Sequence, residues 1–185
     1  LARLADSAEY FGFAADAEAV RRRLADAAAG FAPGAQRVRL LVDADGGTEV
    51  EAHPFTPAPA GAAWRVALAP HPVDPTDPFL HHKTTHRALY EAARAACPGC
   101  DDVILWNERG EVTESTIANI VVERVGERIT PPVECGLLAG TLRAELLDAG
   151  EIREGIVTLE DLRGADALYL INSLRGWIPA SLSHA

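Results

Sequence analysis

The sequence has no methionine and almost no lysine. Lys83 is the only lysine, and the other 16 of the 17 basic side chains are arginines. A chain of this length would ordinarily contain roughly ten lysines. A genomic bias toward arginine explains the shortage, because arginine replaces lysine on most surfaces. Arginine cannot act as an amine nucleophile, however, since its guanidinium stays protonated. Lys83 is therefore the place to look for imine chemistry, with an exposed linker lysine as the alternative.

The sequence also lacks the features of several protein classes. It has no basic run, and a net charge of −10 with a pI near 5.0 argues against a nucleic-acid surface. No apolar stretch approaches the roughly 20 residues of a membrane span, and no signal peptide opens the chain. Because there is no initiator methionine, we expect residues to be missing before Leu1. With 48% hydrophobic and 24% charged residues, the composition is that of a globular protein, which we expect in the cytoplasm.

Cysteine is scarce as well. Three cysteines do not make a disulfide framework, which suits a reducing cytosol. Cys97 and Cys100 have the C-x-x-C spacing of redox and zinc sites. They follow a predicted helix, however, and the negative end of its dipole disfavours a thiolate. A zinc site would need a second ligand pair, and Cys135 is a single candidate. We interpret the motif as a helix-ending turn, with redox or zinc binding as the alternatives.

The first part of the chain predicts two helices followed by strands. Apolar residues at helical spacing predict helices near residues 1–11 and 17–28. Asp16 is the expected N-cap of the second helix, and Gly30 is its expected stop. The period then changes to alternation, which predicts strands at residues 37–42, 48–53 and 64–69, with a turn at residues 45–47.

A proline-rich segment then divides the chain. Residues 71–78 hold three prolines and two Asp-Pro steps, so we expect a linker there. It separates a smaller lobe, residues 1–75 including the linker, from a larger lobe, residues 76–185. The larger lobe mixes helices and strands without strict alternation, which predicts a mixed α/β fold. Its expected helices cover residues 84–96, 141–150 and 160–162, and its expected strands cover residues 103–106, 112–116, 119–123, 128–130, 156–159 and 167–171.

The polar motifs of the larger lobe converge on Lys83, which precedes a predicted helix. Residues 113–119 are a polar patch inside strand-forming sequence, and Gly140 and Thr141 open a helix whose N–H groups suit a phosphate. An amine, a carboxylate and an anion site are what pyridoxal phosphate needs for its aldehyde, its pyridine nitrogen and its phosphate. Dinucleotide, P-loop and nucleophile-elbow motifs are absent. The nearby histidines lack carboxylates at ligand spacing, so we predict no metal at His81, His82 and His86.

Three stretches resemble the fold-type IV pyridoxal-phosphate enzymes, also called the class IV aminotransferase family. They are Lys83–Arg87 (KTTHR), Trp106–Asn119 (WNERGEVTESTIAN) and Leu138–Arg143 (LAGTLR). The family includes branched-chain and D-amino-acid aminotransferases and 4-amino-4-deoxychorismate lyase. The lyase pattern is the most similar, in its Lys-Thr-x-x-Arg start and its Thr-Glu-x-x-x-Ala-Asn core. The resemblance covers nearly the whole chain and implies a two-lobed fold.

The resemblance implies a role for each matching residue. Lys83 would form a Schiff base with pyridoxal 5'-phosphate and then act as the acid and base that moves the substrate's proton. Glu114 would pair with the pyridine nitrogen and keep it protonated. Leu138 would press on one face of the ring. The phosphate would be held by Arg3, by the backbone N–H groups of Thr141 and Leu142, and by the hydroxyl of Ser173.

The sequence departs from the aminotransferases of this family. They commonly carry Asn-Tyr shortly after the lysine, with the tyrosine near the coenzyme's phenolic oxygen, whereas this chain has His86 and Arg87. The difference favours the lyase and leaves the phenolic oxygen without an assigned partner. The family also has strands before the Arg3 helix, and we expect these strands to be missing here. Arg87 and Arg175 are candidates for binding substrate carboxylates, although both are equally compatible with a structural role.

The resemblance therefore implies a lyase that converts 4-amino-4-deoxychorismate to 4-aminobenzoate and pyruvate, a step toward folate. A branched-chain or D-amino-acid aminotransferase is the alternative, because the coenzyme residues serve both reactions. A non-catalytic lobe of a synthase-lyase fusion is the third hypothesis. The family implies a homodimer with the coenzyme between the lobes and a small-molecule substrate. We also expect fusion to, or association with, an aminodeoxychorismate synthase, and we expect no nucleic-acid or membrane partner.

Overall fold

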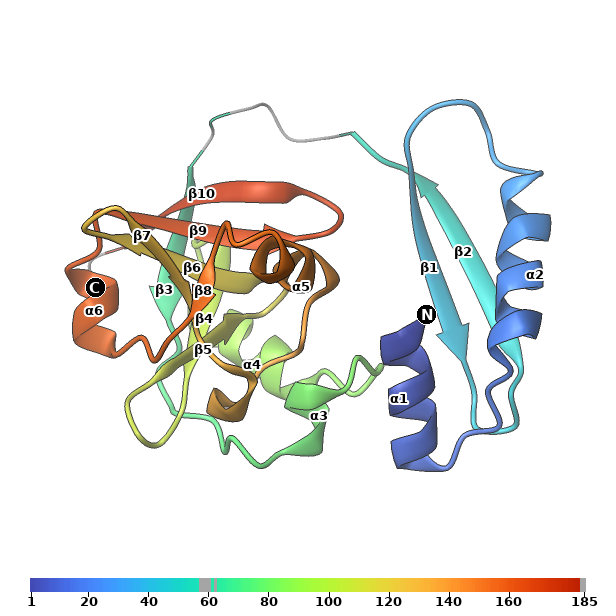
Figure 1. The fold of residues 1–185 in the computed structure, drawn as a ribbon, viewed down its shortest axis with the longest axis horizontal. Helices are drawn as coiled ribbons and strands as arrows, with labels where there is room; N and C mark the ends of the chain where they lie inside the picture. The colour runs from blue at the N-terminus through green and yellow to red at the C-terminus, as the bar shows by residue number, and fades with distance from the viewer. Residues whose placement is uncertain (57–60, 62, 184–185) are drawn as a thin grey trace. The chain divides into compact units, whose positions relative to one another are not determined.

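The structure is a computed structural model that describes residues 1–56, 61 and 63–183. The chain divides into two compact units, Leu1–Pro57 and Ala58–Ala185. Each unit combines α-helices with β-strands (Figure 1). The mixed α/β fold predicted from the sequence is confirmed.

The first unit contains two helices and a β-hairpin. Its elements are α1 (Ala2–Phe11), α2 (Ala17–Ala28), β1 (Gln36–Val42) and β2 (Thr48–Pro54). The Asp16 carboxylate accepts the N–H of Glu18 at 2.9 Å, so Asp16 is the N-cap of α2 as predicted. The turn between the antiparallel strands is held by Asp43, whose carboxylate accepts the N–H groups of Asp45 and Gly47. Local side-chain bonds therefore fix the start of α2 and the turn between β1 and β2.

The second unit is built on a β-sheet that closes on itself. Its strands are β3 (Trp64–Leu68), β4 (Asp102–Trp106), β5 (Val112–Ser115), β6 (Asn119–Arg124), β7 (Glu127–Thr130), β8 (Arg153–Glu154), β9 (Ala167–Asn172) and β10 (Gly176–Leu182). They pair in the order β5-β4-β3-β10-β9-β6-β7-β8. A further pairing of β5 with β6 closes the strands from β5 to β6 in this order into a barrel-like ring, and β7 and β8 extend the sheet beyond it. The closing pair joins Glu114 to Asn119. Every strand of the ring contributes to one buried cluster, in which Ile104, Ile120 and Leu170 are fully buried.

Helices of the second unit lie against this sheet (Figure 1). They are α3 (Pro78–His81), α4 (Ala88–Ala96), α5 (Thr141–Asp148) and α6 (Leu159–Arg163), with a 3-10 helix, η1, at Val133–Cys135. In β4, Ile104 belongs to the cluster inside the ring, whereas the next residue, Leu105, packs with Tyr90 of α4. On α5, Leu146 packs with Ile171 of β9. The alternation of side chains along the strands thus serves three clusters, one inside the ring, one under α4 and one under α5.

The boundary between the units lies earlier than the sequence predicts. β3 pairs in parallel with β4 and β10, so residues 64–68 belong to the second unit and not to a smaller lobe of residues 1–75. The proline-rich segment is not a linker either. Val73 is buried, and its N–H donates to the carbonyl of Trp106 at 2.8 Å. The prediction failed because the partners of a strand are set by tertiary contacts that its own residues do not specify.

Several predicted elements also differ from the observed ones. The helix expected from residue 84 begins only at Ala88, because the Thr84 hydroxyl accepts the N–H of His86 and stabilises a turn before the helix. No strand covers residues 156–159, where Thr158 instead caps α6 through a capping box with Asp161. The sequence pattern predicts neither α3 nor β10.

The turn between β6 and β7 contains an unfavourable residue. Val125 and Gly126 form a two-residue loop between the paired Arg124 and Glu127, and their φ angles are 51° and 79°. A β-branched side chain is disfavoured in this left-handed region, whereas Asn-Gly is the preferred sequence for such a turn. We therefore expect Val125→Asn to raise the free energy of unfolding by about 1 kcal/mol, measured by urea-induced unfolding.

The Val125 side chain is 93% exposed, so the replacement removes little packing. Val38→Asn is the matched control, because Val38 is also exposed but lies within strand β1, where asparagine is unfavourable. That control should lose stability. A Val125→Asn protein less stable than wild type would contradict this account of the turn.

Candidate active site

Lys83 lies in the short connection between α3 and α4, and its side chain is exposed. The connection is ordered by neighbouring contacts. The ring of His86 stacks on Phe79 with 4.1 Å between centroids, and the His86 N–H donates to the Thr84 hydroxyl at 3.1 Å. The positive charge of Lys83 helps to lower the pKa of the Glu114 carboxyl. The structure thus brings the predicted amine and the predicted acid into one electrostatic environment.

Glu114 is a buried carboxyl in β5, only 5% exposed. One oxygen accepts the hydroxyl of Tyr90 at 2.8 Å, and the carboxyl also accepts the backbone N–H of Leu138. Burial raises the pKa of Glu114 to about 8, although these two hydrogen bonds and the charges of Lys83 and Arg87 act in the opposite direction. A desolvated carboxyl of this kind is typical of functional sites and would be ionised readily beside a cation.

The segment that leads into α5 is held from two sides. Glu114 binds the N–H of Leu138, while the Asn119 side-chain amide donates to the carbonyl of the same residue at 2.8 Å. A Cβ atom at Gly140 would collide with the side-chain oxygen of Asn119, so the close approach requires glycine. The Leu138 side chain is half-buried, and its predicted contact with a coenzyme ring stays a prediction.

The N-terminus of α5 has the features of an anion site. The helix begins at Thr141 after Gly140, and no described side chain caps it. The hydroxyls of Thr141 and Ser173 are hydrogen-bonded to each other, so Ser173 lies beside this helix end. The first N–H groups of a helix have no partner within the helix and attract anions. The structure therefore joins three residues predicted to hold the phosphate, namely Thr141, Leu142 and Ser173.

The loop between β9 and β10 carries Ser173 and is shaped by Asn172. The side-chain oxygen of Asn172 accepts the N–H groups of Leu174 at 3.1 Å and Arg175 at 2.9 Å, and its amide donates to the carbonyl of Ile117 at 3.3 Å. The guanidinium of Arg175 lies 5.5 Å from the ring centre of Trp64. Arg175 is exposed at the rim of this loop, and its predicted binding of a substrate carboxylate stays a prediction.

Arg87 and its neighbours on α4 fix the turn that follows β5. Arg87 donates to the carbonyl of Thr116 at 2.6 Å, and its guanidinium lies 4.6 Å from the ring centre of Tyr90. Arg94, two turns further along, pairs with the fully buried Asp102 at 3.1 Å, and Asp102 also accepts the Thr116 hydroxyl. The observed contacts of Arg87 are structural, so its predicted role toward substrate remains untested.

The predicted site residues fall into both units. Eight of them belong to the second unit, whereas Arg3 is a half-buried residue of α1 in the first unit. The role of Arg3 toward a phosphate therefore stays a prediction. Sequence reasoning missed Tyr90, which the three-residue spacing from Arg87 on one helix face could have indicated. It also assigned no role to Asn119, although this residue ends the matched motif.

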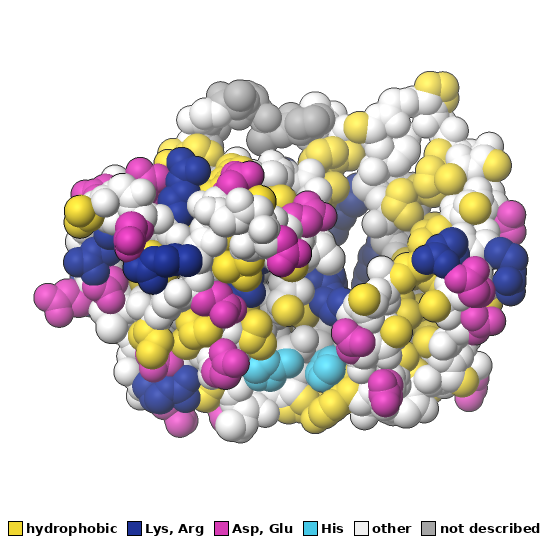
Figure 2. Space-filling model, viewed as in Figure 1, with side chains coloured by type: hydrophobic (Ala, Val, Ile, Leu, Met, Phe, Trp, Pro, Cys, Tyr) yellow, Lys and Arg dark blue, Asp and Glu magenta, His cyan; other side chains and the backbone are white. Residues whose placement is uncertain are grey.

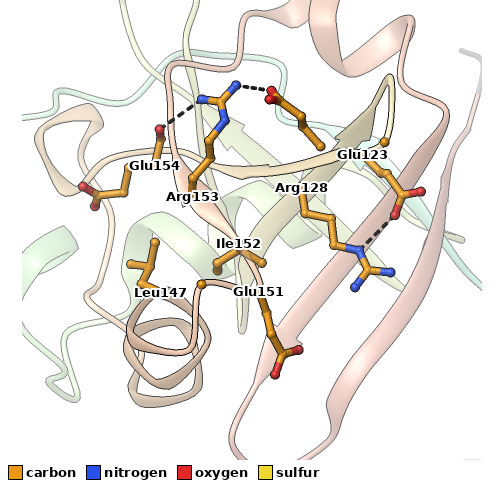
Figure 3. A pocket seen from close by; sticks show the side chains of 10 residues that line it. Glu123, Arg128, Leu147, Glu151, Ile152, Arg153 and Glu154 are labelled. Carbon is orange, nitrogen blue, oxygen red and sulfur yellow. Dashed lines mark hydrogen bonds and ion pairs between the residues drawn. The ribbon is translucent and has the colours of Figure 1, made fainter.

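A separate open cleft of about 730 Å³ lies among the end of α5, β8 and the β6–β7 turn, and none of the predicted site residues lines it (Figure 3). Its charged side chains pair with one another. Arg128 binds Glu123 at 3.0 Å, and Arg153 binds Glu127. Acidic and basic side chains are likewise interspersed over the visible face of the second unit (Figure 2). Because none of the predicted site residues lines this cleft, we do not assign the active site to it.

The alternatives based on cysteine find no support in the thiols themselves. Cys97 follows α4, which ends at Ala96, so the motif does end a helix as predicted. Burial, together with the neighbouring Cys100, raises the pKa of the Cys97 thiol, whereas a redox cysteine needs a lowered one. Within the described residues, no three His, Cys, Asp or Glu side chains are arranged to hold a metal ion. No described helix is long and apolar enough to cross a bilayer.

Curated proteins of several organisms show sequence similarity to this chain. A protein of Schizosaccharomyces pombe, provisionally named an aminodeoxychorismate lyase, is 39% identical over 106 residues, which are 54% of this chain and 46% of that protein. A protein of Thermotoga maritima, provisionally named a branched-chain-amino-acid aminotransferase, is 30% identical over 109 residues, which are 56% of this chain and 39% of that protein. Each match spans less than half the length of the curated relative.

The fold and a family profile agree with this similarity. A crystal structure from Mesorhizobium loti, of a protein provisionally named an amino-acid aminotransferase, matches with a TM-score of 0.92 and 43% identity. The match covers 98% of this chain and 89% of that one. The profile of the family described as amino-transferase class IV matches residues 1–182. The resemblance seen in the three motifs is thereby confirmed, and the chain belongs to the class IV aminotransferase family.

Proposed function

We propose that this protein is a pyridoxal-phosphate-dependent lyase that converts 4-amino-4-deoxychorismate to 4-aminobenzoate and pyruvate. The observation that carries the proposal is the buried carboxyl of Glu114, held by two hydrogen bonds in the unit that also contains the only lysine. The spacing of Lys83 and Arg87 favours the lyase over an aminotransferase. So does the similarity to a protein named for this lyase reaction.

The residues of the second unit suit this coenzyme. Burial leaves the charged form of Glu114 poorly solvated, so a protonated pyridine nitrogen in contact with the carboxylate would form a strong ion pair. The N–H groups of Thr141 and Leu142 and the hydroxyl of Ser173 would hold the phosphate at the start of α5. Lys83 would supply the amine that binds the aldehyde.

The proposed mechanism assigns the proton transfers to Lys83. When bound, pyridoxal phosphate supplies an aldehyde for amines and a ring that withdraws electrons from the substrate. The Nζ of Lys83 would take the proton from the substrate ring carbon that carries the nitrogen. Glu114 would hold a proton on the pyridine nitrogen throughout. The enolpyruvyl group would then leave with the electrons of its broken C–O bond and take up the proton held by Lys83 to become pyruvate. The substrate ring becomes aromatic in this step, which favours the forward reaction.

Amino-acid transamination is the second candidate. It is favoured by the similarity to the Mesorhizobium loti structure, whose protein is provisionally named an aminotransferase. The same lysine and carboxyl would serve, because both reactions begin with an amine on the coenzyme and a proton transfer. The products separate the two, since an aminotransferase passes the amino group of a donor to a keto acid and releases no pyruvate from aminodeoxychorismate.

We further propose that the protein works in the cytoplasm as a homodimer on a small-molecule substrate, with an aminodeoxychorismate synthase as a fused or associated partner. These proposals rest on the family resemblance alone. Measuring the molar mass of the full-length protein in solution would test the dimer.

Replacement of Lys83 tests the proposal directly. We expect the wild-type protein to show the visible absorption band of lysine-bound coenzyme and to release pyruvate from aminodeoxychorismate. Lys83→Ala should lose the band and about 10²- to 10⁴-fold of the activity, while its melting temperature stays unchanged because the side chain is exposed.

Borohydride reduction of the loaded wild-type protein is the control. Within residues 1–185 it should label the side chain of Lys83 and no other, since this sequence has no second lysine. A normal absorption band in Lys83→Ala would refute the assignment. Amino transfer without pyruvate release in the wild type would decide for the aminotransferase.

Burial of Glu114 predicts how the stability of the coenzyme-free protein depends on pH. The pKa of this carboxyl is about 8 in the folded protein, against an ordinary value of 4.5. Between these values the unfolded chain releases a proton that the folded chain keeps, so stability falls as the pH rises from 4.5 toward 8. Glu114→Gln removes this pH dependence. Between about pH 5 and pH 8, we therefore expect its free energy of unfolding to rise by on the order of 3 kcal/mol relative to that of wild type.

Urea-induced unfolding across this pH range measures the effect. Glu111→Gln is the matched control with the opposite sign. The pKa of Glu111 is lowered, first by its hydrogen bond from Arg109, so its replacement should reduce stability at neutral pH. Loaded with coenzyme, Glu114→Gln should also lose activity. No relative gain in stability between pH 5 and pH 8 would contradict the burial argument.

Gly140 provides a test of the phosphate site. A methyl group there would collide with Asn119 and displace the start of α5, so we expect Gly140→Ala to cost roughly 1–3 kcal/mol of stability. Binding of pyridoxal phosphate should weaken as well, as measured by titration of the absorption band. In the matched control Gly164→Ala, the added methyl meets only the Glu160 carbonyl at 3.5 Å, which is an ordinary contact. Equal coenzyme affinity in the two variants would speak against a phosphate at this helix end.

A further inference from the structure

Tyr90 places a hydroxyl in a setting that is otherwise apolar. The residue is 8% exposed and packs in a buried cluster that includes Leu80, Val103 and Leu105. A phenylalanine would fill the same space. The hydroxyl therefore adds one specific feature, its 2.8 Å hydrogen bond to the carboxyl of Glu114.

Two donors from different elements orient the Glu114 carboxyl. The Tyr90 hydroxyl comes from α4, and the Leu138 N–H comes from the segment before α5. Burial and the adjacent carboxyl raise the pKa of Tyr90 far above its ordinary value, so the hydroxyl keeps its proton. A hydroxyl that always carries a proton donates best to an ionised carboxylate, which makes the anionic form of Glu114 more favourable.

The surroundings hold this pair in place. Arg87 covers the Tyr90 ring at 4.6 Å and is itself anchored to the carbonyl of Thr116 at 2.6 Å. The charged groups that act on the pair are Lys83 and Arg87, which favour the carboxylate, and Asp77, which opposes ionisation of the tyrosine. Lys83, Arg87 and the hydrogen bond thus act against burial and favour ionisation of the glutamate, while the tyrosine keeps its proton.

We propose that Tyr90 is a positioning residue that favours the ionised form of Glu114 and orients its carboxylate toward the pyridine nitrogen of the coenzyme. The inference rests on the proposed function, because it requires a coenzyme whose ring nitrogen contacts Glu114. Through this hydrogen bond, α4 sets how strongly the site holds a proton on that nitrogen. Without the hydroxyl, the shared proton moves from the nitrogen toward the carboxylate.

Tyr90→Phe tests the inference, because it removes one oxygen and keeps the ring. The loaded protein, prepared with pyridoxal phosphate labelled with ¹⁵N in the ring, is examined by NMR. We expect a protonated nitrogen in the wild type and a shift toward the unprotonated value in Tyr90→Phe. The kcat should fall about tenfold while KM changes little. Tyr169→Phe is the matched control, because Tyr169 contacts Trp177 on another part of the sheet, and it should match wild type.

A second measurement does not depend on the coenzyme. In the coenzyme-free protein, the ¹³C-labelled carboxyl of Glu114 should titrate at a higher pH in Tyr90→Phe than in wild type. An unmoved Glu114 titration, or a wild-type ¹⁵N shift in Tyr90→Phe, would overturn the inference and leave the proposed function intact. A wild-type protein that binds no pyridoxal phosphate would instead overturn the proposed function, and this inference with it.

Discussion

The pairing of Glu114 with Asn119 is the constraint on which the second unit depends. It is the point at which β5 meets β6 and the sheet becomes a ring. The turn between the strands is tight, because Ser115 donates to the carbonyl of Ala118 through both its N–H and its hydroxyl. The same paired side chains hold the backbone of Leu138, one at its N–H and the other at its carbonyl. Closure of the ring and placement of the segment before α5 are therefore coupled, since a shift between β5 and β6 would disturb both.

The parts of this arrangement that depend on local residues could be predicted from the sequence. Alternating side chains indicate β5 and β6, and Gly140 indicates the start of α5. The hydrogen bonds that assemble the site join distant residues, such as Tyr90 with Glu114 across 24 positions and Asn119 with Leu138 across 19. No periodicity encodes such pairs. The boundary between the units was misplaced for the same reason, because β3 reads as a strand without revealing that its partners are β4 and β10.

The preference for arginine over lysine fits the contacts that the arginines make. Arg87 reaches the carbonyl of Thr116, and the buried Arg143 reaches the carbonyl of Pro131 at 2.8 Å. A planar guanidinium with several fixed donors suits such anchoring better than an ammonium group does. Lys83 has a different setting, since it is exposed in a connection between two helices. Under the proposed function it is also the position where an amine that can lose its proton is indispensable. Compositional bias explains why lysines are rare, and the proposed chemistry explains why this one is retained.

The buried carboxyl also links stability to the proposed chemistry. Removal of Glu114 from water is unfavourable for its charged form, and the hydrogen bonds from Tyr90 and Leu138 only partly offset this cost. The fold tolerates the cost because the ring to which β5 belongs has an apolar interior, in which Ile104 and Ile120 are fully buried. The group that would favour ionisation most is a cation in direct contact with the carboxylate. A protonated ring nitrogen is such a cation. The same contact would therefore bind the coenzyme and stabilise the charged form of the buried carboxyl.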